Sequence, residues 1–195
     1  MWVEPVTLEG TRVRMEPLSL ERHWDGLLAI ALVPEIWRFM INDVRDAASL
    51  RGYLDTAALE LTEGRSLPFA TIDLASGRVA GCTRFGSIDE RHRRVEIGWT
   101  WVGREFQRTH VNTEAKYLML RHAFETLDCV RVEFRAHALN ERSRSAMERI
   151  GAKFEGTLRR HMVRETGEWR DTVCYSILAD EWPAVKARLE ERPRR

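Results

Sequence analysis

The chain has few cysteines, no long apolar run and no signal-peptide pattern, so it lacks the features of secreted, zinc-binding or membrane-spanning proteins. Its 195 residues include three cysteines, Cys82, Cys129 and Cys174, which are odd in number and far apart. That usage is typical of a reducing compartment and argues against a disulfide framework or a zinc site. No apolar run approaches the ~20 residues that a membrane-spanning helix needs, and the N-terminus has no signal-peptide pattern. We therefore expect a cytoplasmic protein without a metal or a membrane partner.

An excess of charge of one sign is also missing. Lys and Arg number 31 against 30 Asp and Glu, which leaves a net charge of +1. Without a basic field, nothing in the charge balance predicts a nucleic-acid partner. Apolar residues make up 44% and charged residues 31%, the composition of a globular protein that can bury a sizeable core. At this length we expect residues 1–195 to form one domain.

Hydrophobic periodicity predicts a chain of mixed strands and helices, without an internal repeat or a domain linker. Strands are expected at 11–18, 67–74, 79–87, 95–102, 130–136, 153–164 and 169–178, and helices at 19–32, 47–63, 113–127, 140–150 and 181–191. Ser19 can cap the first helix, and Pro34 is expected to end it. Gly151 is expected just past the end of the fourth helix, where a left-handed residue is common.

The stretch 107–116 lies between the strand at 95–102 and a long apolar helical pattern. Asn112 or Thr113 is a good N-cap for that helix, and Glu114 adds negative charge to its first turn. A strand that runs through a loop into a helix aims free backbone N–H groups and the positive end of the helix dipole at one point. This arrangement suits a pyrophosphate. An ordinary capped helix is the alternative, because the loop lacks the glycines that let a phosphate approach.

Two motifs resemble the GNAT N-acetyltransferase superfamily, and in particular its RimJ/RimL-like branch. The stretch 107–116 is similar to the acyl-CoA pyrophosphate loop Gln/Arg-x-x-Gly-x-Gly/Ala, although His110 stands at the first glycine position and Asn112 at the Gly/Ala position. The segment 140–156 resembles the Asn-x-x-Ser and Gly-Phe-x-x-Glu-Gly segments of that branch, with Ala152 at the Phe position. The order of strands and helices is similar to the GNAT topology over nearly the entire chain.

The resemblance implies an α/β GNAT fold in which helices flank a mixed, largely antiparallel sheet. In that fold the strands that hold Glu96 and Val132 splay apart, and the pantetheine of the acyl-CoA lies between them. Gly98 is then expected to mark a bulge or a close backbone approach, or merely to make room for a tryptophan. The cofactor-binding residues that the resemblance implies are Trp101, Val102, Gln107, Arg108, Thr109, His110, Val111, Asn112, Thr113, Asn140 and Ser143.

The same resemblance implies direct attack of an amine on the thioester of acetyl-CoA, without a metal. Ser143 is the expected proton donor to the leaving thiolate, unless it is only an early residue of a helix that Asn140 caps. Glu96, whose burial would raise its pKa, and His161 are the expected catalytic bases. His137 is a third candidate, and water could take the place of a base.

The predicted function is transfer of an acetyl group to a primary amine, either a small molecule or a protein N-terminus. One alternative is a different acyl group such as succinyl, whose carboxylate Arg84, Arg159 or Arg160 could receive. The other is a catalytically weak CoA-binding or interaction protein, which His110 in the loop suggests. His110 is also expected to turn outward as a cation beside the phosphates. Seven tryptophans are many for one domain, and a pocket or a homodimer contact is the alternative to core packing for some of them.

Overall fold

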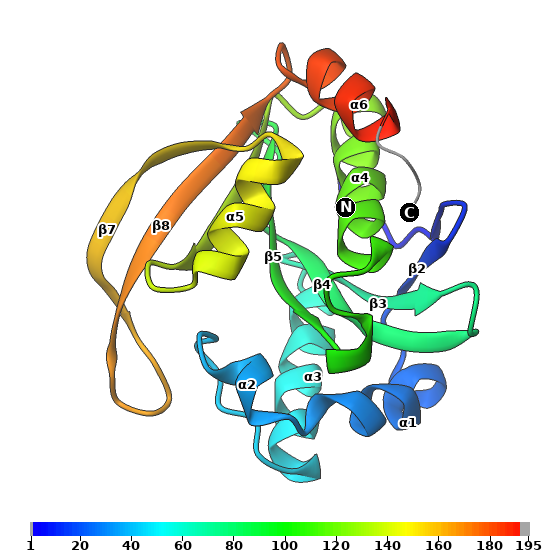
Figure 1. Ribbon diagram of the computed structural model, residues 1–195, viewed down its shortest axis with the longest axis vertical. Helices are drawn as coiled ribbons and strands as arrows, with labels where there is room; N and C mark the ends of the chain where they lie inside the picture. Colours follow the sequence, from blue (N-terminus) through cyan, green and yellow to red (C-terminus); the bar gives the residue numbers. More distant parts are fainter. Residues whose placement is uncertain (1, 192–195) are drawn as a thin grey trace.

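The computed structural model describes residues 2–191, and within that range one eight-stranded sheet runs through the molecule (Figure 1). Its strands are β1 (Leu8–Glu9), β2 (Val13–Pro17), β3 (Leu67–Asp73), β4 (Arg78–Asp89), β5 (Arg94–Val102), β6 (Arg131–His137), β7 (Lys153–Val163) and β8 (Trp169–Leu178). They lie in the order β1-β2-β3-β4-β5-β6-β8-β7. The β5–β6 pair is parallel and its neighbouring pairs are antiparallel, which confirms the mixed, largely antiparallel sheet.

Helices pack on both faces of this sheet. They are α1 (Leu20–Ala31), α2 (Pro34–Trp37), α3 (Ala47–Thr62), α4 (His110–Glu125), α5 (Glu141–Ile150) and α6 (Trp182–Glu191), with the 3-10 turn η1 (Arg104–Phe106) before α4. One apolar core joins the sheet to α4, α5 and α6, and a second joins it to α1, α2 and α3. Alternation along β4 sets this division, because Cys82 packs in the second core while Phe85 packs in the first.

Capping residues fix where the first helices begin. The Ser19 hydroxyl accepts the backbone N–H of Arg22 at 3.4 Å and caps α1, as expected. Asp46 and Ser49 form a reciprocal capping box at the start of α3. As expected, α1 ends before Pro34, at Ala31. Pro34 is then the first residue of the short α2, where the missing N–H of proline has no helical partner to lose.

The start of α4 differs from the sequence prediction. The helix begins at His110, and the hydroxyl of Thr109 caps it by accepting the backbone N–H two residues on, at 3.3 Å. The predicted caps Asn112 and Thr113 therefore lie inside the first turn, and that prediction is wrong. Arg108 explains the difference, because its left-handed conformation (φ 63°) turns the chain into the helix earlier. The segment before α4 is thus shorter than the motif suggested.

The parallel pair β5–β6 parts as the sequence predicted. Paired residues run from Arg94 opposite Arg131 to Glu96 opposite Glu133, and no later residue of β5 in the described range pairs with β6. Glu96 therefore lies at the last point where the two strands meet. Backbone groups of the following residues, on the β6 side of β5, are left without a neighbouring strand.

The β7–β8 hairpin curves past α5, and its tip contacts the loop that follows α2 (Figure 1). At its tip the carboxylate of Glu165 accepts the side-chain amide of Asn42 and the backbone N–H of Asp43, both at 2.7 Å. The guanidinium Nε of Arg164 donates to the carbonyl of Met40 at 2.9 Å. Two segments far apart in sequence are thereby held together beside the β6–β8 part of the sheet.

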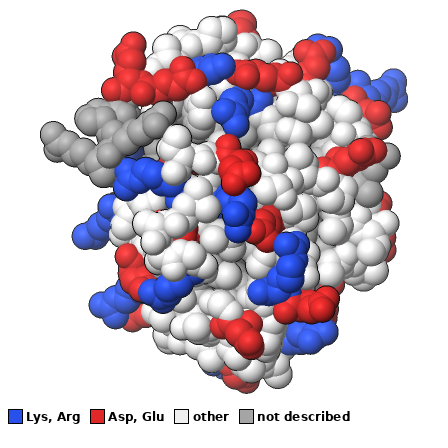
Figure 2. Space-filling model, turned by 90° about the vertical axis from the view of Figure 1, so that its right-hand side faces the viewer, with Lys and Arg blue, Asp and Glu red and all other residues white. Residues whose placement is uncertain are grey.

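Charges of both signs are interspersed on the face shown in Figure 2, in keeping with the net charge of +1. Within residues 2–191, no helix is both long enough and apolar enough to cross a membrane. In the same range, no three side chains of His, Cys, Asp or Glu converge as ligands for a metal ion.

Candidate active site

A β-bulge interrupts β5 just past the point where it leaves β6. One residue of β4, Thr83, faces two residues of β5, Trp99 and Thr100. Trp99 has a left-handed conformation with φ 50°, which is rare for a bulky side chain and re-aims the strand. The bulge therefore lies one residue beyond Gly98, close to the position that the sequence indicated.

Gly98 has a different use from the one expected for it. A Cβ at Gly98 would lie 3.0 Å from Oε1 of Glu96, so the missing side chain leaves room for that carboxylate. The glycine that makes room for a tryptophan is Gly86, where a Cβ would lie 2.4 Å from the ring of Trp99. The close approach at Gly98 is therefore by a side chain two residues away on the same strand, and not by backbone as expected.

Glu96 is the buried carboxylate of this region, with only 6% of its surface exposed. Burial raises its pKa, and the nearby charge of Glu133 adds to that effect. The Arg135 guanidinium at 3.3 Å and the Ser87 hydroxyl, which donates at 3.0 Å, offset part of the rise. A carboxylate whose pKa is raised toward neutrality is suited to accept a proton from an ammonium group.

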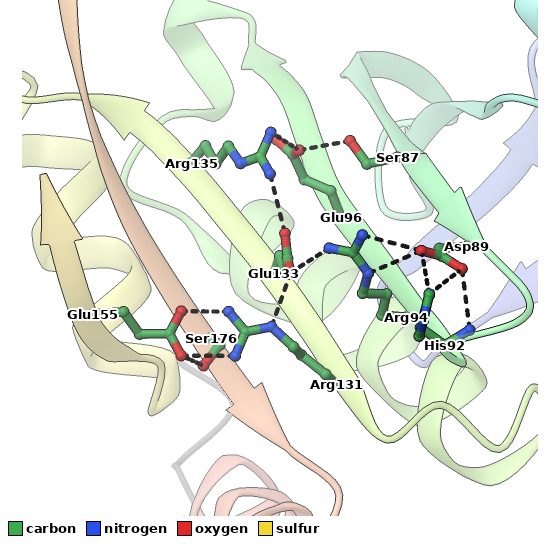
Figure 3. A network of polar contacts seen from close by, with 10 residues as sticks. All are labelled: Ser87, Asp89, His92, Arg94, Glu96, Arg131, Glu133, Arg135, Glu155 and Ser176. Atoms are coloured by element: carbon green, nitrogen blue, oxygen red, sulfur yellow. Dashed lines mark hydrogen bonds and ion pairs between the residues drawn. The ribbon is translucent and has the colours of Figure 1, made fainter. Parts of the chain in front are cut away.

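A network of ion pairs extends from Glu96 across the sheet (Figure 3). Arg135 joins Glu96 to Glu133 at 3.2 Å, and Arg94 joins Glu133 at 3.1 Å to Asp89 at 3.0 Å. The network also contains Ser87, His92, Arg131, Glu155 and Ser176. Because each of these carboxylates has more than one partner, the network holds Arg135 in place and with it the charge that faces Glu96.

On the opposite face of the sheet, Lys116 reaches the bulge from α4. Its Nζ donates to the hydroxyls of Thr100 at 2.6 Å and Thr83 at 3.1 Å, and the two hydroxyls lie 2.8 Å apart. Burial lowers the pKa of Lys116 to about 7. Lys116 was not predicted as a site residue, because its position in the sequence matches that of a polar residue on the exposed face of an amphipathic helix. Only the bulge explains its burial.

Three arginines surround a hollow of about 370 Å³ before α4. They are Arg104, Arg108 and Arg142, and the hollow is also lined by Val33, Glu35, Ile36 and Gln107. Within residues 2–191, no group accepts a hydrogen bond from the backbone N–H of Arg108 or Thr109. Free N–H groups, a helix N-terminus and three guanidinium groups together form an anion site suited to phosphates.

Gln107 links the two loops that border this hollow. Its side-chain amide donates to the carbonyl of Val102 at 2.8 Å and accepts from Arg142 at 2.9 Å. The Val102 carbonyl is therefore already bonded within the protein, although Val102 is one of the residues expected to bind the cofactor. The indole of Trp101 is buried against Trp37, with the ring centroids 5.4 Å apart.

His110 does not turn outward as expected. Its Nε2 lies 3.0 Å from a carboxylate oxygen of Asp73, and Nη2 of Arg12 lies 2.6 Å from its Nδ1. Since an arginine can only donate, Nδ1 accepts and Nε2 holds the proton. Burial favours a higher pKa for Asp73, but hydrogen bonds from Ser76 and His110 hold it below its usual range. His110 thus ties α4 to the β3–β4 hairpin instead of facing the arginine-lined hollow.

Asn140 and Ser143 stand at the start of α5. The Asn140 side chain accepts the backbone N–H of Ser143 at 3.1 Å, which is the N-cap that the sequence left as the plainer alternative. The hydroxyl of Ser143 is half-buried and makes no hydrogen bond with any residue in the described range. Capping thus uses the backbone of Ser143 and leaves its side chain available.

The two histidine candidates lie apart. His161 is exposed on β7 and has no hydrogen bond within the described part of the chain, so the structure does not join it to Glu96. His137 is buried at the end of β6, against the ring of Phe39 at 5.3 Å. Burial lowers its pKa, and the charges of Arg170 and Arg164 lower it further.

The arginines considered for an acidic acyl group are not placed for that role. Arg84 is buried against Tyr53 and Trp99 and forms an ion pair with Glu60 at 2.8 Å. Arg159 and Arg160 are exposed on β7. Besides Arg135, Arg170 of β8 lies close enough to Glu96 for the two charges to interact, and it was not among the arginines considered for this role.

A parting parallel strand pair, a bulge beside it and an arginine-lined helix start define the class of this protein as an acetyltransferase that uses acyl-CoA. The family model for the acetyltransferase (GNAT) domain matches residues 12–153. The chain therefore belongs to the GNAT acetyltransferase family.

Individual relatives agree with this assignment. YdaF of Bacillus subtilis (strain 168), provisionally named a ribosomal N-acetyltransferase, is 35% identical over 113 residues, which are 58% of this chain and 61% of that protein. A GCN5-related N-acetyltransferase from Brucella melitensis has a similar structure, with a TM-score of 0.90 and 36% identity over 97% of this chain and 86% of that one. RimJ of Mycobacterium smegmatis, solved with CoA-disulfide, has a TM-score of 0.82 and 25% identity over 97% and 96% of the chains.

Proposed function

We propose that this protein transfers the acetyl group of acetyl-CoA to a primary amine, a small molecule or a protein N-terminus. The observation that carries the proposal is the position of Glu96. It is a buried carboxylate with a raised pKa at the point where β5 and β6 part. A base is useful there, because an amine is protonated at neutral pH and must lose a proton before it can attack.

The cofactor fits the residues that border the hollow before α4. Arg104, Arg108 and Arg142 would hold its phosphates, together with the free backbone N–H groups at the start of α4. The unpaired edge of β5 after Glu96 would receive the pantetheine.

Acetyl-CoA supplies an activated thioester. In the transfer, Glu96 accepts a proton from the ammonium group, so that the amine nitrogen forms a bond to the acyl carbon as the carbon–sulfur bond breaks. The hydroxyl of Ser143 donates a proton to the leaving sulfur, as its free side chain permits, and takes up the second proton that the amine nitrogen loses as the amide forms. Backbone N–H groups near the bulge at Trp99 would stabilise negative charge on the acyl oxygen.

The family relatives suggest the kind of acceptor. YdaF carries the name of a ribosomal N-acetyltransferase, and its aligned part spans 61% of its length. A ribosomal acceptor would be a protein N-terminus and would place this enzyme in the cytoplasm. We extend the proposal to the whole chain as one acetyltransferase domain, since the sheet continues from β1 to β7 through both apolar cores.

The test is a thiol-release assay with acetyl-CoA and a panel of amines and N-terminal peptides. We expect turnover above the rate without acceptor, and saturable binding of coenzyme A by calorimetry. Arg108→Gln should weaken that binding, whereas Arg91→Gln, at an exposed arginine in the β4–β5 turn, should leave it unchanged. Binding without turnover on any acceptor would favour the alternative of a catalytically weak CoA-binding protein.

A further inference from the structure

Arg170 is a buried cation without a partner among residues 2–191. The residue is 7% exposed, and its side chain forms neither a hydrogen bond nor an ion pair in that range. Its Nε is fully enclosed without a hydrogen bond. The small exposed part of the guanidinium group therefore belongs to its two terminal nitrogens. Burying a charge without pairing it is costly, and a group that stays in this state is a candidate for binding an anion.

Two further donors lie beside Arg170. Thr172 is two residues along β8 on the same face, and its hydroxyl is enclosed without a hydrogen-bond partner in the described residues. His137 is the partner of Thr172 across the β6–β8 register. The Nδ1 of His137 accepts the backbone N–H of Leu139 at 3.1 Å, so its Nε2 holds the proton and can donate. Arg170, Thr172 and His137 therefore form a set of donors, here called the β8 donor set.

Positive charge outweighs negative charge around the β8 donor set. Arg170 and Arg164 act on His137 more strongly than the carboxylates of Asp171 and Glu168 do, and Arg164 repels Arg170. Glu96 is the carboxylate that attracts Arg170, but its own contacts are with Ser87 and Arg135. A carboxylate brought in by a bound molecule would pair with Arg170 and relieve this repulsion.

We propose that the β8 donor set binds a carboxylate of the substrate, so that the acceptor is an amine that carries a carboxylate a few bonds away. Amino acids with a free amine and short acidic peptides have this chemistry, and polyamines do not. The inference rests on the proposed acetyl transfer, because it places the amine at Glu96. Glu96 and Arg170 sense each other's charge, which keeps the distance between the two ends of the acceptor short.

The same carboxylate chemistry has a second source, the acyl group of a donor such as succinyl-CoA. The experiment therefore has two arms. In the first, acetyl-CoA is tested with matched acceptors that differ only in carboxylate against carboxamide: β-alanine against β-alaninamide, and Ala-Asp amide against Ala-Asn amide. In the second arm, acetyl-CoA and succinyl-CoA are compared with one neutral amine as acceptor.

The variant Arg170→Gln removes the charge and keeps a polar side chain, and Arg91→Gln makes the same change at an exposed position. We expect the wild type to prefer the carboxylate member of each pair by about 10- to 100-fold in kcat/KM, mostly through KM. Arg170→Gln should abolish the preference by lowering kcat/KM for the carboxylates by about 10- to 100-fold and for the carboxamides by a much smaller factor, and Arg91→Gln should behave as the wild type. Thr172→Val should reduce the preference and serves as the test if Arg170→Gln does not fold.

A preference that appears only between succinyl-CoA and acetyl-CoA, and that Arg170→Gln removes, assigns the carboxylate to the acyl donor. Equal losses on both members of every pair, or an unchanged preference, overturn the proposal. The imidazole NMR signals of His137 give a readout without turnover. They should shift on titration with glutarate but not with glutaramide, and not in Arg170→Gln. This shift would appear even if no acceptor is acetylated, so failure of the proposed function and failure of this inference remain distinguishable.

Discussion

Lys116 is a lysine whose position is set by hydroxyl groups instead of carboxylates. Its hydrogen bonds to Thr83 and Thr100 fasten the two sides of the bulge in β5 to α4. Burial lowers its pKa to about 7 from an ordinary value of 10.5, so the unfolded chain binds a proton between these values that the folded chain does not. The free energy of unfolding should therefore increase as the pH rises from about 7 to 10.5, and below pH 7 this increase is absent.

We expect Lys116→Met to remove that rise. The difference in unfolding free energy between variant and wild type should be largest near pH 7 and shrink toward pH 10, with an upper limit of roughly 5 kcal/mol from the size of the pKa shift. Urea unfolding across this range measures it. Lys153→Met, at a lysine whose side chain is 74% exposed, is the matched control. A constant difference from pH 7 to pH 10 would show that Lys116 is charged in the folded protein.

Glu96 predicts the acid side of the pH–rate profile. Because burial raises its pKa, the catalytic base becomes protonated at a higher pH than an exposed glutamate would, and kcat/KM should fall there. Glu96→Gln should lower kcat by roughly 10²–10⁴ and remove this limb. Glu90→Gln, an exposed glutamate of the β4–β5 turn, is the control. If the limb persists in Glu96→Gln, another group titrates and Glu96 is not the base.

Ser143 should affect the departure of the thiol and not the affinity for the cofactor. Because its backbone, and not its hydroxyl, takes part in the cap of α5, Ser143→Ala should fold normally. We expect kcat to fall by roughly 10²–10⁴ with the affinity for coenzyme A little changed. Single-turnover kinetics beside calorimetry separate the two quantities. An unaltered kcat would mean that Ser143 serves only as a residue of the first helical turn.

Among the elements, β5 brings most of the candidate site together. It carries Glu96, the bulge at Trp99 and the edge left free by β6. Gly98 lies between the base and the bulge, and an added Cβ there would come within 3.0 Å of Oε1 of Glu96. That contact is with the end of a flexible side chain, so the carboxylate can move aside at little cost in stability.

Gly98→Ala should therefore lower kcat even though the protein remains folded and nearly as stable as the wild type. Displacing the carboxylate of Glu96 misplaces the base, while the melting temperature should change by only a few degrees. Gly156→Ala on β7, where a Cβ would meet nothing within 4 Å, is the control and should leave kcat unchanged. If Gly98→Ala retains full kcat, Glu96 tolerates displacement and its placement is not critical.

Elements set by local patterns could be predicted from the sequence, and contacts between distant segments could not. Alternation gave β6, and Ser19 and Gly151 gave the ends of α1 and α5, because these features depend on residues close in the chain. The cap of α4 was misplaced by three residues, because Asn112 and Thr109 are both good caps and the choice depends on the backbone of Arg108. Local propensity alone does not rank them.

In the candidate site the same distinction holds. Glu96 was predicted as a base from the splayed strands of the fold, and its catalytic role stays a prediction. Lys116 and Arg170 were not predicted as buried charges, because burial of a charged side chain depends on which strands pack around it and not on the neighbouring residues in the sequence. His110 was assigned to the phosphates because of its place in the motif, whereas Asp73 and Arg12, far away in the sequence, direct its ring elsewhere.

At the scale of the whole molecule, the β7–β8 hairpin forms one edge of the sheet. It carries Arg170 on β8 and reaches the loop after α2 at its tip (Figure 1). The strand β7 is exposed along nearly its full length, so its position depends on pairing with β8 and on the contacts of the tip. On other elements lie the arginines proposed to hold the cofactor, Arg104, Arg108 and Arg142. Of the elements around the hollow before α4, the tip is hydrogen-bonded only to α2 within the described part of the chain, through Arg164 and the carbonyl of Trp37.

Loosening the hairpin tip should therefore weaken binding of the amine acceptor and leave binding of coenzyme A unchanged. Glu165→Ala removes the acceptor of two hydrogen bonds of 2.7 Å, from Asn42 and from the backbone of Asp43. We expect KM for the amine to rise severalfold, because Arg170 and the loop beside His137 are less well held, while the affinity for coenzyme A stays the same. Glu90→Ala, at an exposed glutamate of the β4–β5 turn outside the hairpin, is the control. Steady-state kinetics and calorimetry on both variants decide the matter, and equal weakening of amine and coenzyme A in Glu165→Ala would contradict a separate role for the hairpin.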